Sequence, residues 1–263
     1  MTNRQPKDRS GSGENFISVK TSEGCSSVVL VCEHASDFFP AEFGTLGLDE
    51  AVRKNHVAWD PGALSVAEHM AALLDATLVA GQVSRLIYDC NRPPDAPDAM
   101  PQRSEIFEIP GNADLNEAER SKRVDAVYTP FKTSLQTAIA RVSSPIIVTI
   151  HSFTPVYNGA SRSVEIGVLH DTDTRLADAM LTLAPRYTQA DVQRNQPYGP
   201  QNGVTHTLKE HAIKAGHLNV MLEIRNDLIQ SAEQQKQMSE MLAPWVAEAC
   251  VQAGAEGVVQ CKA

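Results

Sequence analysis

The sequence is poor in several features that mark particular classes of protein. It has five cysteines among 263 residues, and they form no CxxC pair and no disulfide framework, so we expect a reducing, cytoplasmic location. No apolar stretch approaches the roughly 20 residues that cross a bilayer. Residues 1–23 are polar and lack the apolar core of a signal peptide, and we expect them to form a flexible leader.

An excess of basic charge and the common nucleophile motifs are lacking as well. The formal net charge is −9 and the pI is near 5.4, which argues against nucleic acid or an anionic membrane as a partner. The sequence has no GxSxG elbow and no Walker loop, so the usual serine hydrolases and nucleoside triphosphatases are excluded. Its eight histidines include no HExxH pair. Any active site must therefore be assembled from residues far apart in the sequence.

Strands alternate with helices along the chain, which predicts a single domain over residues 24–263. Apolar runs indicate strands at 28–32, 76–80, 83–88, 146–151, 164–169 and 218–224. Helical periodicity indicates helices at 48–55, 61–74, 116–142, 172–184, 205–215 and 231–253, the last with a kink or break at Pro244. This alternation is typical of a sheet covered on both faces by helices, a three-layer α/β/α domain.

Two predicted strands end in the same way, with a histidine directly after the apolar run. Val28–Cys32 leads to Glu33 and His34, and Ile146–Ile150 leads to His151. Both runs are continuous rather than alternating, as in a parallel sheet that is buried on both faces. Because ligands gather at the carboxyl ends of strands in such sheets, we interpret the two histidines as candidates for one metal site.

Two carboxylates are candidates for a further ligand. Asp60 stands before Pro61 at the start of a predicted helix, where an aspartate is either a helix cap or a metal ligand, and capping is the commoner role. Glu33 is next to His34, but neighbouring residues of a strand point to opposite faces. Glu33 and His34 can therefore point to one metal ion only if the end of the strand is irregular.

Residues 84–93 are dense in groups that bind anions. Arg85 and Arg92 can clamp a carboxylate, and Asn91 can hydrogen-bond it. The alternative for Arg85 is a structural ion pair with Asp89. We favour a role in the site because two arginines and an asparagine occur together near the carboxyl edge of the sheet.

Glu223 lies inside the apolar strand 218–224, where an unpaired carboxylate is costly. Burial raises the pKa of a carboxylate, which suits a general base or acid near neutral pH. The alternative is a buried pair with Arg225, which lies two residues further on and on the same strand face. Tyr198, in the loop 195–199, is a further residue that can reach a substrate.

A series of short motifs resembles the N-formylglutamate amidohydrolases over residues 27–230. The motifs are CEHAS at 32–36, WDPGA at 59–63, SRLIYDCNRP at 84–93, IHS at 150–152 and EIRNDLI at 223–229. The resemblance implies an architecture similar to that of the zinc carboxypeptidases and aspartoacylase-type deacylases, an α/β fold of the phosphorylase/hydrolase-like class. It implies a mixed, mostly parallel sheet of about eight strands and one Zn²⁺ per chain.

The resemblance also implies a role for particular residues. The residues that match zinc ligands are His34, Asp60 and His151, with Glu33 as an alternative ligand or a residue behind them. The residues that match catalytic groups are Glu223 as general base and Arg85 beside the oxyanion. The candidates for substrate binding, from the motifs and from the loop near them, are Arg85, Asn91, Arg92, Tyr198 and Arg225.

The function that the resemblance implies is hydrolysis of the amide bond of a small N-acyl amino acid similar to N-formylglutamate, with Zn²⁺ as cofactor and the small molecule as partner. We expect Glu223 to take a proton from water and return it to the departing amine, while zinc and an arginine stabilise the oxyanion. One alternative is a peptidase or deacylase for a larger substrate, and another is a ligand-binding relative without catalysis. Retention of both histidines together with Asp60 and Glu223 favours an enzyme.

Overall fold

A seven-stranded mixed sheet forms the centre of the computed structural model, which describes residues 16–22, 24 and 26–262. The strand order is β1 (Ile17–Lys20), β3 (Thr77–Gly81), β2 (Val28–Cys32), β6 (Ile146–Phe153), β11 (Asn219–Arg225), β9 (Ile166–Leu169) and β10 (Val192–Arg194). Neighbouring strands are parallel except in the pairs β1–β3 and β11–β9. The predicted mixed, mostly parallel sheet is confirmed, with one strand fewer than the resemblance implies.

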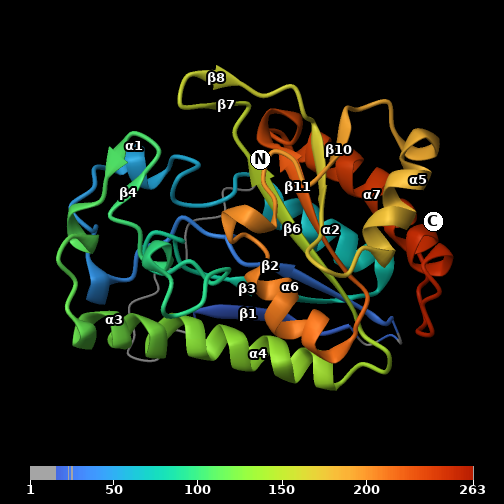
Figure 1. Ribbon diagram of the computed structural model, residues 1–263, viewed down its shortest axis with the longest axis horizontal. Helices are drawn as coiled ribbons and strands as arrows, with labels where there is room; N and C mark the ends of the chain where they lie inside the picture. The colour runs from blue at the N-terminus through green and yellow to red at the C-terminus, as the bar shows by residue number, and fades with distance from the viewer. Residues whose placement is uncertain (1–15, 23, 25, 263) are drawn as a thin grey trace, which may run out of the picture.

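Helices cover both faces of this sheet, so that the fold has three layers (Figure 1). One face carries α2 (Ala63–Leu74), α5 (Arg175–Tyr187) and α7 (Ala232–Gln252). The other carries α6 (His206–His211) and a long helix in three parts, α3 (Glu117–Arg123), the π-helical segment η4 (Val124–Tyr128) and α4 (Thr129–Ala140). The predicted α/β/α fold class is confirmed.

The two faces of the sheet pack into two separate apolar clusters, which explains the continuous apolar strands. In β2, Val28 and Leu30 belong to the cluster under α2, whereas Val29 and Val31 belong to the cluster under α4. Burying one such aliphatic side chain stabilises the fold by about 1.5–3 kcal/mol. A strand with a buried face on either side therefore needs apolar residues at successive positions.

The connections between these elements carry short elements of their own. They are α1 (Glu50–Arg53), the hairpins β4 (Arg103–Ser104)–β5 (Phe107–Glu108) and β7 (Val156–Tyr157)–β8 (Ala160–Ser161), and the 3-10 turns η1 (Ala41–Phe43), η2 (Pro97–Ala99), η3 (Pro110–Asn112), η5 (Pro200–Asn202), η6 (Ile213–Ala215) and η7 (Asn226–Leu228). Figure 1 shows the β7–β8 hairpin in yellow at the top of the view, extending beyond the carboxyl end of β6.

The strand predicted at 83–88 is wrong, because this segment forms buried turns. Its backbone hydrogen bonds go to two loops: Ser84 N donates to Phe38 O at 2.8 Å, and Arg85 N donates to Ala58 O at 3.1 Å. The apolar residues of the segment are buried, as they would be in a strand. The apolar pattern of this segment therefore reflects its burial and not a strand. The turns place Arg85 at the carboxyl edge of the sheet.

The end of the expected leader belongs to the sheet. Residues 1–15 lie outside the described residues, but Ile17–Lys20 form β1 and pair antiparallel with β3. The expectation of a flexible leader over 1–23 is therefore wrong for these residues. Ile17 is buried and Lys20 is exposed, as in an edge strand with one covered face.

Two prolines act differently in the long helices. The helix predicted at 116–142 is present, but it is interrupted by η4 just before Pro130. Pro130 lacks an N–H and crowds the preceding turn, which accounts for the interruption. In contrast, α7 continues through Pro244 without a break. Among the described residues no helix has both the length and the apolar character needed to span a membrane.

Gly62, at the start of α2, packs closely against the backbone of Ile229. Its φ is +84°, and a Cβ there would lie 2.6 Å from Ile229 O. We expect Gly62→Ala to lower the free energy of unfolding by about 2 kcal/mol or more, measured by urea denaturation, because backbone strain adds to this contact. Gly216→Ala is the control, since its φ is +73° but nothing lies within 4 Å of its Cβ. Equal losses in the two variants would contradict the close packing at Gly62.

Candidate metal and catalytic site

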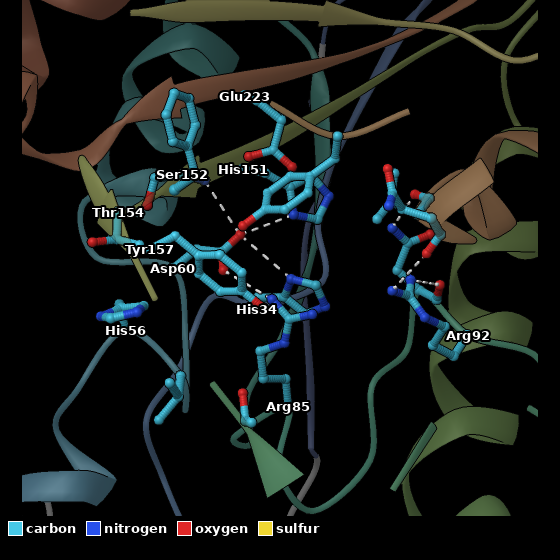
Figure 2. Close-up of a pocket in the computed structure, with 17 residues that line it drawn as sticks. His34, His56, Asp60, Arg85, Arg92, His151, Ser152, Thr154, Tyr157 and Glu223 are labelled. Carbon is cyan, nitrogen blue, oxygen red and sulfur yellow. Dashed lines mark hydrogen bonds and ion pairs between the residues drawn. The ribbon is translucent and has the colours of Figure 1, made fainter. Parts of the chain in front are cut away.

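The carboxyl ends of β2, β6 and β11 meet at a cavity of about 280 Å³ (Figure 2). His34 comes from the turn that follows β2, His151 from β6 and Glu223 from β11. Glu223 is paired in register with His151 on the neighbouring parallel strand, so the two side chains lie on the same side of the sheet. The centroids of the His34 and His151 rings are 4.9 Å apart. The structure therefore brings together the two histidines that the sequence places at strand ends.

Asp60 joins the two imidazoles. Its Oδ2 lies 2.9 Å from His151 Nδ1 and 3.4 Å from His34 Nδ1, and Ser152 N donates to the same oxygen at 3.3 Å. The Asp60 backbone N donates to His34 O at 2.9 Å, which fixes the loop before α2 against the end of β2. His34, Asp60 and His151 each offer one ligand atom, and these atoms lie within 4.8 Å of one another.

The helix-cap alternative for Asp60 is wrong. The N-cap of α2 is Gly62, and no side chain caps the first turn of this helix. The Asp60 side chain is 4% exposed and points to the two histidines (Figure 2). A buried carboxylate without partners is strongly destabilising, so the imidazoles determine where this side chain lies.

A further carboxylate faces the Nε2 atom of each histidine, the ring nitrogen that does not face Asp60. Asp89 Oδ1 lies 2.7 Å from His34 Nε2, and Glu33 Oε2 lies 3.1 Å from His151 Nε2. A carboxylate behind an imidazole fixes the tautomer and the orientation of the ring, and it leaves the other nitrogen available as a ligand. Both Nδ1 atoms therefore face Asp60, and Glu33 lies behind His151.

This set of donors fits a divalent metal ion. Two imidazole nitrogens and one carboxylate oxygen are the ligands of many catalytic zinc sites, where a fourth position stays open for water or substrate. The carboxylates behind the imidazoles are the usual outer partners of such ligands. Glu33 is not part of the His34–Asp60–His151 cluster. Its Oε2 is within ion-pair distance of His151 Nε2, whereas Asp60 faces His151 Nδ1.

The two carboxylates that face the cavity have opposite pKa shifts. Burial alone would raise the pKa of Asp60, but the charges and hydrogen bonds of His34 and His151 hold it well below its usual range. Burial raises the pKa of Glu223 to about 7, although the charge of His151 opposes the rise. Asp60 is therefore a permanent anion, whereas Glu223 can take up or release a proton near neutral pH.

Arg85 brings a positive charge to this cluster. Its Nη2 donates to Asp89 Oδ2 at 2.7 Å, and its Nη1 lies 3.5 Å from Asp60 Oδ1. The side chain is 29% exposed and lines the cavity. The two alternatives from the sequence, an ion pair with Asp89 and a position in the site, are both present.

Asn91 and Arg92 also line the cavity, but their polar groups bind other parts of the chain. Asn91 Nδ2 donates to Val204 O, and Asn91 Oδ1 accepts from Thr207 N at 2.9 Å. Arg92 Nε donates to Asp98 Oδ2 at 2.6 Å, and its other nitrogens donate to three backbone carbonyl oxygens. In Figure 2, Arg92 stands apart from the cluster of His34 and Asp60. These residues thus hold the wall of the cavity.

Tyr198 lines the cavity, whereas Arg225 is not among the described residues that do so. The Arg225 guanidinium donates to Asp227 Oδ1 at 2.8 Å and lies 3.4 Å from Glu165 Oε1. Two carboxylates outside the cavity therefore neutralise it. Arg225 therefore pairs with these carboxylates rather than with Glu223, and its expected role in substrate binding stays a prediction.

Sequence reasoning missed several residues in and behind the cavity. The sequence predicts Asp89 only as a partner of Arg85, whereas its contact with His34 depends on the turns at 84–92. Figure 2 places His56, Thr154 and Tyr157 around the cavity as well. These side chains come from a loop and a hairpin, where no periodic pattern in the sequence marks a functional position.

Comparison with known proteins gives one family and similar solved structures. A sequence model of N-formylglutamate amidohydrolase matches residues 26–230. No curated protein matches the chain. A gene product of Agrobacterium tumefaciens has 50% sequence identity and a TM-score of 0.88, over 90% of this chain and 96% of that one. The N-formylglutamate amidohydrolase of Ralstonia eutropha has 18% identity and a TM-score of 0.59, over 88% and 96%, and shares the fold.

Proposed function

The chain belongs to the N-formylglutamate amidohydrolase family, and we propose that this amidohydrolase cleaves the amide bond of a small N-acyl amino acid such as N-formylglutamate. One water molecule is consumed, and the products are the carboxylic acid (formate for this substrate) and the free amino acid. The observation that carries the proposal is the meeting of the His34–Asp60–His151 cluster with Glu223 in one cavity.

We propose that His34, Asp60 and His151 hold a divalent metal ion, with zinc the best match to the donors. When bound, the metal would act as a Lewis acid, polarising the acyl oxygen and lowering the pKa of the attacking water molecule. Asp89 orients the His34 imidazole and Glu33 the His151 imidazole, each through the Nε2 atom. This arrangement supports metal-assisted hydrolysis.

In this mechanism Glu223 moves the protons. It accepts a proton from the water that attacks the acyl carbon and delivers a proton to the nitrogen that leaves. Two observations support this role: no hydrogen bond from a described residue engages the carboxylate, and burial raises its pKa to about 7. A base that is already saturated by hydrogen bonds would be a weaker proton acceptor.

Arg85 and Tyr198 are the proposed contacts of the substrate. The exposed part of the Arg85 guanidinium can stabilise the negative charge that develops on the acyl oxygen or bind a substrate carboxylate. Asn91 and Arg92 keep the opposite wall in place through the contacts described above. They contribute to substrate binding through the shape of the cavity.

The size of the cavity favours a small substrate over a peptide. Its volume of about 280 Å³ is just below the range for small-molecule sites, which is roughly 300–1,000 Å³. The complete donor set and the free Glu223 carboxylate speak against a ligand-binding relative without catalysis. A larger substrate would need the hairpins at the rim to move apart.

The proposed substrate class can be tested by a hydrolysis screen with the zinc-loaded protein. We expect the highest kcat/KM for N-formyl-L-glutamate, lower values for N-acetyl-L-glutamate and N-formyl-L-leucine, and the lowest for a glutamyl tetrapeptide. Release of free amine is the readout, and the same protein treated with a chelator is the control. Preference for the tetrapeptide would overturn the small-substrate proposal.

The metal site can be tested by removing single ligands. We expect the wild type to hold about one zinc per chain, and His151→Ala and Asp60→Asn to lose most of it. Metal content after dialysis, measured by plasma mass spectrometry, is the readout. His69→Ala is the matched control, because His69 is exposed on α2. Full zinc content in both ligand variants would contradict this site.

The role of Glu223 can be tested by Glu223→Gln, which keeps the shape of the side chain. We expect kcat to fall by about 10²–10⁴-fold with zinc content unchanged, because proton transfer is lost while the metal ligands remain. Glu240→Gln, an exposed change on α7, should leave kcat as it is. A Glu223→Gln enzyme with the full rate would rule out Glu223 as the base.

A further inference from the structure

Arg162 follows the β7–β8 hairpin, and aromatic rings surround its guanidinium. The distances from Arg162 Cζ to the ring centroids are 4.5 Å for Tyr157, 4.7 Å for Tyr198 and 5.6 Å for Phe153. All three rings line the cavity. Within the described part of the chain, Arg162 forms no ion pair with a carboxylate. Cation–π contacts therefore hold this charge at the wall of the site.

The backbone of Arg162 is fixed from two directions. Arg162 N donates to Pro155 O at 2.8 Å, which closes the base of the hairpin. Arg225 Nη1 donates to Ser163 O at 3.0 Å and to Arg162 O at 3.4 Å. Arg225, which does not line the cavity, thus holds the segment that carries Arg162.

The hydrogen bond from Arg162 to Tyr198 has a fixed direction. Arg162 Nη1 donates to the Tyr198 hydroxyl oxygen at 2.9 Å. A guanidinium has no acceptor, so the hydroxyl can only accept in this contact, and its own proton must point elsewhere. No described residue accepts that proton. Tyr198 therefore keeps a donor available at the cavity.

Tyr198 lines the same cavity as the reacting groups of the proposed mechanism. Burial and then the charge of Glu223 raise the pKa of Tyr198, while the charges of Arg162 and Arg85 oppose the rise. The phenol stays protonated at neutral pH and can donate a hydrogen bond. Glu223 and Arg85, which we place at the substrate amide, line this cavity too, so the acyl oxygen of a bound substrate lies in the cavity that Tyr198 lines.

We propose that Arg162 is a positioning residue, which holds the Tyr198 oxygen so that the hydroxyl proton is directed to the acyl oxygen of the substrate. The inference rests on the proposed function, since the N-acyl amino acid supplies that oxygen. Negative charge develops on the acyl oxygen as water adds, so a donor held in place stabilises the transition state more than the bound substrate. The effect of Arg162 therefore falls mainly on kcat.

A double-mutant cycle tests this inference with N-formyl-L-glutamate as substrate. We expect Tyr198→Phe to lower kcat by about 10–100-fold with a smaller change in KM, and Arg162→Met to do the same. The double variant should be no slower than the slower single variant, because Arg162 acts through the hydroxyl that Tyr198→Phe removes. Arg162→Lys keeps a charged donor and should recover part of the lost rate.

Control measurements separate positioning from folding. Zinc content and the urea midpoint are measured for every variant, and Arg141→Met, an exposed change at the end of α4, should leave kcat unchanged. Losses that multiply in the double variant, a normal kcat in Arg162→Met, or a lost kcat that parallels lost folding and is not recovered by lysine would each overturn the inference. If the wild type hydrolyses no N-acyl amino acid, the proposed function fails and this role of Arg162 fails with it.

Discussion

The buried carboxylate of Asp60 is the group on which the arrangement of the site depends. A carboxylate shielded from water must be paired and hydrogen-bonded, and here the partners are His34, His151, Arg85 and the backbone N–H of Ser152. These partners come from three segments of the chain, and Asp60 itself lies in a fourth. The end of β2, the strand β6, the loop before α2 and the turns at 84–92 therefore have to meet at one point.

The segment 84–93 contributes both to the charged cluster around Asp60 and to the wall of the cavity. In the segment 84–93, Asp89 contacts His34 and Arg85 pairs with Asp89, whereas Asn91 and Arg92 bind the backbone of the loop at 203–204. The rim is built in a comparable way, since Arg162 is held by aromatic rings that themselves line the cavity. Asn91, Arg92 and Arg162 thus stabilise the wall of the cavity, whereas the charged groups at its centre pair with one another.

The features that could be predicted are those with a local signal. Continuous apolar runs marked β2, β6 and β11, and polar residues at their ends marked His34, His151 and Glu223. The strand predicted at 83–88 failed because burial gives the same apolar pattern to a set of turns as to a strand. Arg225 pairs with Asp227 and Glu165 rather than with Glu223, two residues before it in the strand, because the fold brings these carboxylates to its guanidinium. The β7–β8 hairpin left no periodic signal.

By itself, the amino-acid sequence determined the order of strands and helices, the apolar character of the central strands and the strand ends that carry polar groups, because these depend on residues close together in the chain. The tertiary structure decided which polar groups meet. Asp60 and His151 are 91 residues apart, and Arg162 and Tyr198 are 36 apart. Whether Asp60 caps a helix or joins two imidazoles depends on the energy of contacts between such distant segments, and no local pattern carries that information.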